Sequence, residues 1–161
     1  MVDVWHCDAE GIYSGVTDTA VGFDTTGTQF LRGYQVTGED GVAAFTTIYP
    51  GWYTGRTVHI HFKIRTTGSD GQAYEFTSQL YFDDALSDQV FAQEPYSAKG
   101  QRDQLNATDG IFQEETLLSP VGAEAGGYNA TFAIALDLSD ADTGAADGGG
   151  GPGGGPPPGG G

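Results

Sequence analysis

An alternating run from Val58 to Arg65 constrains the fold of this chain more than any other segment. Period-two alternation of apolar and polar residues predicts a β-strand with one buried face, because successive side chains of a strand point to opposite sides. The apolar positions are Val58, Ile60, Phe62 and Ile64, and the polar positions are His59, His61, Lys63 and Arg65. His59 and His61 therefore project from the same side of the strand, close enough to bind one metal ion.

Tyr53 precedes this strand and follows a turn at Pro50 and Gly51 that can bring its phenol toward the two histidines. Two imidazoles and a phenolate form a hard, anionic ligand set, which suits Fe(III) better than a soft metal. A His-x-His pair alone is a weak sign of a metal, because many sheets carry histidines on a solvent-exposed face. The pair leaves both interpretations open.

The composition limits the classes of partner. The chain has 161 residues, enough for one domain, and its 22 acidic and 6 basic residues give a net charge of −16. Such a surface repels nucleic acids and anionic membranes, so we expect neither as a partner. Extreme acidity with only two lysines is typical of proteins that work in molar salt. We therefore expect a halophilic source and a fold that loses stability as salt is removed, with an ordinary acidic protein as the alternative.

Turn signals divide the chain into short strands. Glycines at 38 and 41 predict a hairpin between Phe30–Thr37 and Val42–Tyr49, and a second hairpin joins Val58–Arg65 to Ala73–Phe82. Residues 111–112 and 116–118 suggest two further short pieces of strand. Alternation over Thr131–Leu138 predicts the strand that closes the fold.

The fold class expected from these elements is all-β, an antiparallel β-sandwich with one short helix at Asp83–Gln93. We place the domain at residues 1–142. Residues 143–161 consist almost entirely of glycine and proline, have nothing to bury, and are predicted to form a disordered tail. No run of apolar residues is long enough to span a membrane.

Five blocks of sequence follow one another in an order that is specific. They are Val4–Gly15, Phe30–Thr37, Phe45–Tyr53, His59–His61 and Ser78–Phe82. In this order they resemble the intradiol ring-cleavage dioxygenases, the family of catechol and protocatechuate dioxygenases, and most of all its small single-domain members.

The resemblance implies an Fe(III) cofactor with four protein ligands, which are Tyr13, Tyr53, His59 and His61. It implies cleavage of a catechol-type aromatic diol by O2 between the hydroxyl-bearing carbons, giving a muconate-type diacid. Tyr53 is expected to leave the metal when substrate binds and to take a substrate proton. Arg56 is expected to stabilise negative charge on the ring, and Gln79 to orient the same oxygens.

The resemblance also implies that sandwich strands precede the opening strand, Val2–Trp5. An unpaired edge strand with apolar residues invites aggregation, so we expect further sequence upstream of residue 1. A signal peptide could lie there, which leaves both a cytoplasmic and a secreted location open. Cys7, the only cysteine, is either a small buried side chain or half of a disulfide with an upstream partner.

A different class of function stays open beside catalysis. The chain could be a non-catalytic β-sandwich module that retains the metal site and binds carbohydrate or an aromatic polymer. Arg56 would then be a surface residue on a turn. Three aromatic residues could line a pocket but are more typical of a core: Trp52, Tyr34 and Tyr49. The sequence does not decide the oligomeric state.

Overall fold

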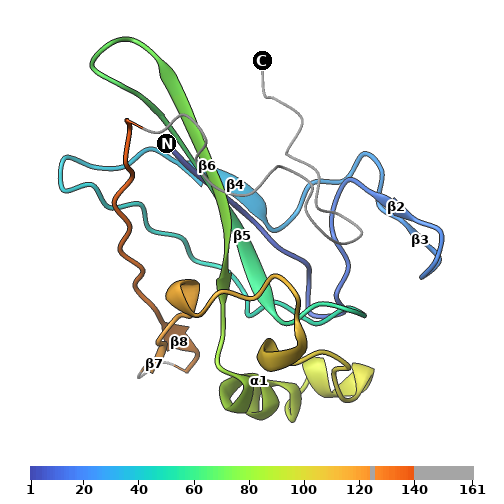
Figure 1. Cartoon of the computed structure of the whole chain (residues 1–161). Coiled ribbons are helices and arrows are strands. Elements are labelled where there is room, and N and C mark those ends of the chain that lie inside the picture. Colours follow the sequence, from blue (N-terminus) through green and yellow to red (C-terminus); the bar gives the residue numbers. More distant parts are fainter. Residues whose placement is uncertain (124–125, 140–161) are drawn as a thin grey trace.

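A four-stranded antiparallel sheet forms the centre of the computed structural model, which describes residues 1–123 and 126–139. Its strands lie in the order β4–β1–β5–β6 (Figure 1). They span Arg32–Gln35 (β4), Val2–Trp5 (β1), His59–Thr67 (β5) and Ala73–Tyr81 (β6). Two strand pairs lie outside this sheet: β2 (Thr17–Asp18) with β3 (Phe23–Asp24), and β7 (Val121–Gly122) with β8 (Tyr128–Asn129).

The two faces of the central sheet differ in chemistry. Trp5 lies opposite both Arg32 and His61, and His61 lies opposite Gln79, so one face carries polar and aromatic groups. The other face is apolar. One residue along from the Trp5–His61 pair, Val4 lies opposite Phe62, and these side chains point to the opposite side of the sheet. Phe132 packs on Phe62 with ring centroids 5.9 Å apart, so the extended chain after β8 covers the apolar face.

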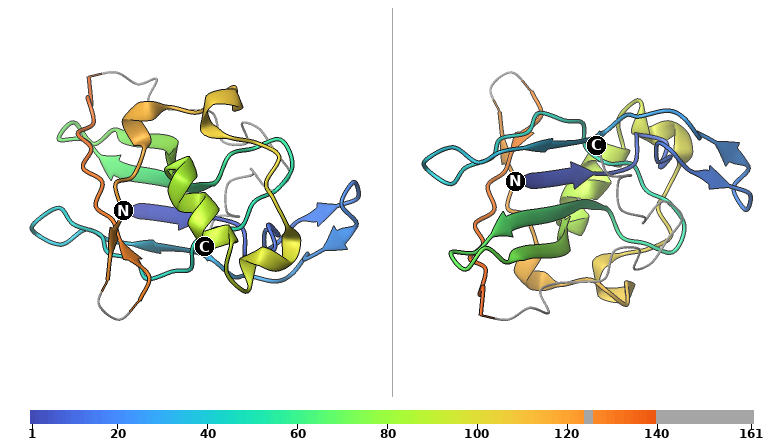
Figure 2. Two further views of the ribbon diagram at one scale, coloured as in Figure 1. Left: turned by 90° about the horizontal axis from the view of Figure 1, so that it is seen from below. Right: turned by 90° about the horizontal axis from the view of Figure 1, so that it is seen from above.

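One helix, α1 (Asp84–Phe91), follows β6 directly and lies at that end of the sheet (Figures 1 and 2). It begins where the Asp83 carboxylate accepts a hydrogen bond from Leu86 N, which is the usual role of an N-cap aspartate. Its Val90 and Phe91 pack with Val58 into the larger hydrophobic core. Three short 3-10 helices follow, at Tyr96–Lys99, Asn106–Thr108 and Glu114–Thr116.

The expected fold class, all-β and antiparallel with one short helix, is confirmed, and so are Val2–Trp5, the second hairpin and the helix. Two expected strands are wrong: Val42–Tyr49 and Thr131–Leu138 run without ladder pairing. The turn between Gly38 and Val42 forms, but β4 pairs with β1 and the chain then leaves the sheet. Within Thr131–Leu138, Phe132 packs on the apolar face, whereas Ile134 and Leu138 are exposed.

The pieces expected at 111–112 and 116–118 are also not strands. A 3-10 helix occupies Glu114–Thr116, and Leu117 makes one parallel bridge to Tyr81. β1 is also not the unpaired edge strand expected from the sequence, because it lies between β4 and β5. The tail at 143–161 lies outside the described residues. Within them, the longest helix has 8 residues, too few to cross a membrane.

Candidate metal centre

Four donor atoms meet on the polar face of the sheet. His59 Nε2 lies 3.1 Å from His61 Nε2, 3.2 Å from the Tyr53 hydroxyl and 3.4 Å from the Tyr13 hydroxyl. The two tyrosine rings contact each other edge to face at 5.6 Å. The structure therefore brings all four expected ligands together, although Tyr13 lies 46 residues before His59 in the chain.

Two tight turns place the tyrosines side by side. Gly51 N donates to Asp8 O at 2.9 Å, and a Cβ on Gly51 would lie 2.5 Å from the carbonyl oxygens of Asp8 and Ala9. Gly11 has a positive φ of 80°, and its missing Cβ would meet the Trp52 carbonyl. Only glycine allows this backbone contact, which fixes the segment before Tyr13 against the segment before Tyr53.

Hydrogen bonding and stacking orient the imidazoles. His59 Nδ1 lies 2.7 Å from Thr57 O, and since a carbonyl only accepts, Nδ1 carries the proton and Nε2 presents its lone pair. The His61 ring stacks on the Trp5 indole with centroids 4.9 Å apart and planes 5° from parallel. His61 is thereby held with little rotational freedom.

Burial sets the protonation of the four groups in the metal-free protein. It lowers the pKa of His59 to about 3 and that of His61 well below its usual range, and the nearby Arg56 charge adds to both effects. Burial also raises the pKa of Tyr53 to about 12 and that of Tyr13 well above its ordinary value. At neutral pH both imidazoles are free bases and both phenols are protonated.

This donor set fits a hard, trivalent ion. Two imidazole nitrogens with two phenol oxygens suit Fe(III), and a metal converts a phenol to a phenolate by direct coordination. Among the described residues no group of three or more histidine, cysteine or carboxylate side chains could hold a metal. The tyrosines are therefore needed to complete any site here.

Arg56 lies beside the cluster and is held on two sides. Its Nε donates to Asp109 Oδ2 at 2.9 Å, and its Nη2 donates to Gln79 Oε1 at 2.5 Å. The Tyr81 hydroxyl lies 2.9 Å from the same Gln79 oxygen. Arg56 is buried, so the alternative of a surface residue on a turn is wrong.

Sequence reasoning missed Asp109, which anchors Arg56. No sequence motif singles out Asp109, and only the folded chain brings it next to Arg56, 53 residues earlier. The stacking of Trp5 on His61 was missed for the same reason. Of the three aromatics considered for a pocket, Tyr49 and Trp52 are half-buried against the larger core, and Tyr34 is exposed.

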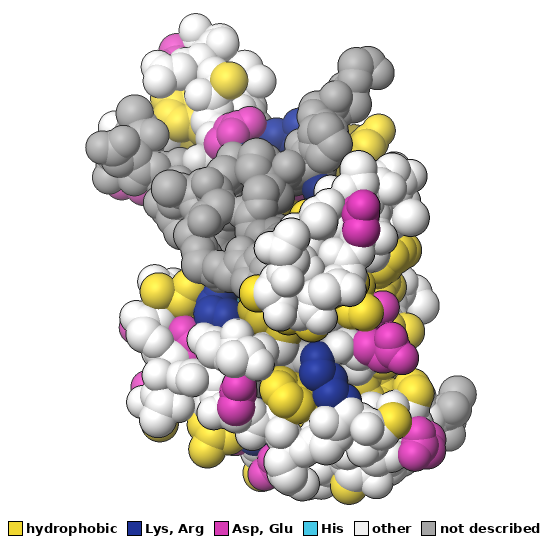
Figure 3. All heavy atoms as spheres, turned by 90° about the vertical axis from the view of Figure 1, so that its right-hand side faces the viewer, with side chains coloured by type: hydrophobic (Ala, Val, Ile, Leu, Met, Phe, Trp, Pro, Cys, Tyr) yellow, Lys and Arg dark blue, Asp and Glu magenta, His cyan; other side chains and the backbone are white. Residues whose placement is uncertain are grey.

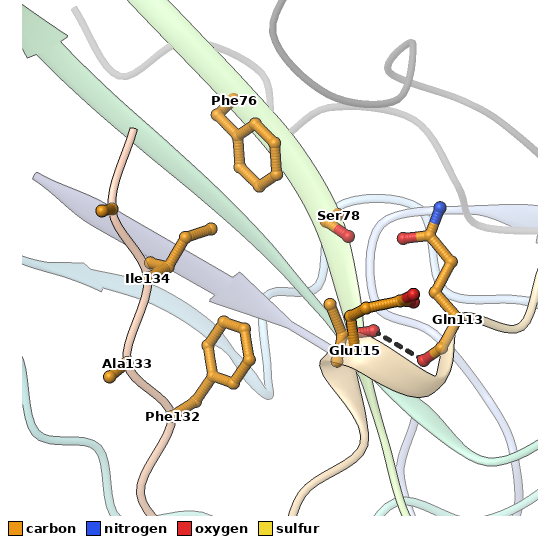
Figure 4. Close-up of a pocket in the computed structure, with 9 residues that line it drawn as sticks. Phe76, Ser78, Gln113, Glu115, Phe132, Ala133 and Ile134 are labelled. Atoms are coloured by element: carbon orange, nitrogen blue, oxygen red, sulfur yellow. Dashed lines mark hydrogen bonds between the residues drawn. The ribbon is translucent and has the colours of Figure 1, made fainter. Parts of the chain in front are cut away.

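Other surface features lie apart from the cluster. A hollow of about 580 Å³ lies between β6 and residues 132–135, lined by Phe76 and Ser78 (Figure 4). These side chains alternate with Gln79 along β6, so the hollow opens on the opposite face of the sheet. On the surface shown in Figure 3, basic side chains stand apart from one another among hydrophobic and acidic ones.

Known proteins that are similar to this chain are named as dioxygenases. A chlorocatechol 1,2-dioxygenase from Pseudomonas putida is 29% identical over 101 residues, which cover 52% of this chain and 35% of that enzyme. An intradiol ring-cleavage dioxygenase from Tetranychus urticae has a TM-score of 0.63 and 32% identity, covering 74% of this chain and 62% of that one.

A third relative decides the family. The dioxygenase domain of a dioxygenase and carbohydrate-binding protein fusion from the bacterium Streptomyces sp. SirexAA-E has a TM-score of 0.54 and 31% identity. The match covers 85% of this chain and 67% of that domain. The chain belongs to the intradiol ring-cleavage dioxygenase family.

Membership in the intradiol family confirms the resemblance found in the sequence and relates the chain to oxidoreductases that use O2. The chain spans about a third of the length of the Pseudomonas relative and less than two thirds of the Tetranychus one. No model of a known protein family matches the sequence.

Proposed function

We propose that this protein is an Fe(III)-dependent intradiol dioxygenase. It cleaves a catechol-type ring between the two hydroxyl-bearing carbons and releases a muconate-type diacid. One C–C bond breaks and both atoms of O2 enter the product, so the reaction consumes no further oxidant or reductant. One observation carries the proposal: His61 Nε2 and the hydroxyl oxygens of Tyr53 and Tyr13 lie 3.1–3.4 Å from His59 Nε2.

Tyr13, Tyr53, His59 and His61 would hold the iron. A ferric ion bound there supplies a Lewis acid and a template for the two catechol oxygens. The charge of two tyrosinates and one hydroxide balances that of the ion. Tyr53 Oη, as the phenolate, accepts one of the two catechol protons, because its pKa is high whenever it is not coordinated.

Arg56 and Gln79 supply the electrostatics next to the substrate. The guanidinium is fixed by Asp109 and by Gln79 Oε1, so it does not need to reorganise when negative charge develops on the ring. Gln79 Oε1 accepts from Arg56, which directs its amide nitrogen away from the guanidinium. That nitrogen can donate to a substrate oxygen.

The test is a visible absorption spectrum with an iron assay, before and after catechol is added without oxygen. We expect a tyrosinate-to-iron band that shifts with catechol, followed by O2 uptake and formation of diacid when air is admitted. A protein that stays colourless after ferric loading contradicts the proposal. Purification in high salt guards against unfolding of an acidic chain.

Tyr53→Phe separates catalysis from a non-catalytic binding module. Under the proposed function, ring cleavage falls at least about a hundredfold, within the range for losing a proton-transfer group. Under the alternative, binding of an aromatic ligand persists unchanged. The carbohydrate-binding part of the Streptomyces fusion is named separately from its dioxygenase domain, and no feature of the site in the described chain favours the alternative.

A further inference from the structure

Lys99 joins the two turns that carry the tyrosines of the candidate metal centre. Its Nζ donates to Trp52 O at 2.7 Å and to Glu10 O at 2.5 Å. Trp52 directly precedes Tyr53, and Glu10 lies three residues before Tyr13. Lys99 itself lies 47 residues after Trp52 and 89 residues after Glu10. The ammonium is therefore a cross-link between both turns that comes from a third part of the chain.

The same segment holds Trp52 in two further ways. The Lys99 ammonium lies 4.7 Å from the centre of the indole ring, which is a cation–π contact. The indole Nε1 donates to the carbonyl oxygen of the next residue, Gly100, at 3.2 Å. The main chain and the side chain of Trp52 are thus both fixed by residues 99–100, directly before Tyr53.

The turns leave room for this ammonium, and its donors are directed at them. A Cβ on Gly11 would lie 2.6 Å from Lys99 Nζ, so a larger residue at position 11 would crowd the ammonium. The ion pairs within residues 1–123 and 126–139 do not include Lys99, although the chain has 22 acidic residues. An ammonium has three donors, and two of them go to main-chain carbonyls of the turns rather than to a carboxylate.

We propose that Lys99 is a positioning residue that clamps Tyr53 beside Tyr13 at the candidate metal centre. This inference rests on the proposed function, in which Tyr53 binds the metal and, once released, accepts a catechol proton. Because the main chain of Trp52 is fixed, Tyr53 moves by rotation of its own side chain while the turn stays in place. Its hydroxyl, 3.2 Å from His59 Nε2 in this structure, can then return to the same position.

The turn before Tyr53 depends on the clamp more than the turn before Tyr13 does. The Asp8 carboxylate accepts from two amides of its own turn, both at 2.9 Å, so the turn before Tyr13 is closed internally. The hydrogen bonds of Trp52 instead reach residues 99 and 100. Hydrogen bonds from a charged donor are stronger than neutral ones. Loss of the ammonium should therefore loosen Tyr53 and leave Tyr13 in place.

The first experiment needs no metal. It compares hydrogen exchange at Gly51 N, which donates to Asp8 O next to the clamp, with exchange at Phe62 N in the middle of the sheet. A global loss of stability speeds exchange at Phe62 at least as much, so only local loosening raises the ratio of the Gly51 rate to the Phe62 rate. We expect this ratio to rise about tenfold in Lys99→Met. This is the lower end for a hydrogen bond from a charged group, because Lys99 is exposed.

Two further variants make this result specific. Lys99→Arg keeps a cation with several donors and should restore most of the protection at Gly51. Ser97→Ala is the matched control, because it removes the 2.7 Å hydrogen bond from Ser97 Oγ to Glu94 Oε1 in the same segment and touches neither turn. The ratio should keep its wild-type value in Ser97→Ala. An unchanged ratio in Lys99→Met, or an equal rise in Ser97→Ala, overturns the clamp.

The second experiment tests whether Lys99 acts through Tyr53. A chelator removes Fe(III) from the loaded protein, and the tyrosinate-to-iron band reports the rate. We expect Lys99→Met to lose iron about tenfold faster than the wild type. Added to Tyr53→Phe, the same substitution should change the rate by less than about twofold, because the clamped turn then carries no ligand. An effect of full size in the Tyr53→Phe protein overturns the assignment of Lys99 to Tyr53.

The two experiments also separate this inference from the proposed function. Exchange at Gly51 that does not depend on Lys99 overturns the clamp even when catechol is cleaved. Exchange that does depend on Lys99, in a protein that binds no iron, supports the clamp and overturns the proposed function.

Discussion

Asp109 and Arg56 form a buried ion pair beside the four candidate metal ligands. The Arg56 Nε–Asp109 Oδ2 distance is 2.9 Å, and the side chains are 8% and 1% exposed. The same Asp109 oxygen accepts from Thr57 N at 2.8 Å, so the loop that carries Asp109 is tied to the start of β5. Burial would raise the pKa of Asp109, but the hydrogen bonds from Ile111 N, Thr57 N and Arg56 outweigh it and lower that pKa.

Asp109→Asn leaves the Arg56 charge buried without its partner. Breaking a buried pair in this way costs about 3–5 kcal/mol. We expect chemical denaturation to show a loss of that order, together with a fall in kcat of about tenfold or more because Arg56 is no longer fixed. Asp103→Asn is the control, since Asp103 is an exposed acid on the same loop that accepts only from Gly55 N in the described chain. Equal effects of the two variants would contradict a special role for Asp109.

Binding of a ferric ion should release two protons from the protein, besides the one lost by the water that becomes the bound hydroxide. Tyr13 and Tyr53 are protonated at neutral pH in the metal-free protein, whereas His59 and His61 are already neutral. Only the phenols then lose protons when the four ligands coordinate, and apparent affinity rises with pH accordingly. A pH-indicator titration counts the protons released by the protein, after correction for hydrolysis of the added iron. Tyr13→Phe should release one, and release of two from this variant would contradict the ligand assignment.

The metal-free protein should lose stability as pH falls from about 7 toward 5.5. Burial lowers the pKa of His6, His59 and His61 below the value of about 6.5 expected in the unfolded chain. In this window the unfolded state binds more protons than the folded state, so protonation favours unfolding. The stabilisation is complete above about pH 7 and is lost as pH falls below about 6.5.

Each of these histidines contributes a slope of up to about 1.4 kcal/mol per pH unit. Urea denaturation at pH 7.5, 6.5 and 5.5 in constant salt measures the slope. Bound iron should reduce it, because coordinated imidazoles do not titrate in this range. A metal-free protein whose unfolding free energy is flat across this range would show that the histidines are not buried as described.

Gly51→Ala should disturb both the fold and the metal centre. The added Cβ would lie 2.5 Å from two carbonyl oxygens that belong to the opposing turn, and these cannot move without shifting Tyr13. We expect a loss of about 1–3 kcal/mol, as for overpacked sites, together with weaker iron binding. Gly33→Ala is the matched control, because a Cβ there meets nothing within 4 Å. Full iron affinity in Gly51→Ala would contradict the role of this contact.

The sequence by itself determined the features that depend on local periodicity. Alternation predicted β5 and placed His59 and His61 on one side of it, and an acidic start with helical spacing predicted α1. These patterns succeed because side-chain direction along one element depends only on the backbone geometry of that element. The ordered blocks of sequence identified the family and, through it, the four candidate ligands, because such blocks retain residues that meet at one site.

The tertiary structure alone decided which residues from distant segments meet. Asp109 reaches Arg56, and Trp5 stacks on His61, only because loop packing and sheet register bring them together. Pairing likewise cannot be found within one segment: Val42–Tyr49 contains β-branched and aromatic residues typical of a strand, yet it pairs with no neighbouring strand in the described chain.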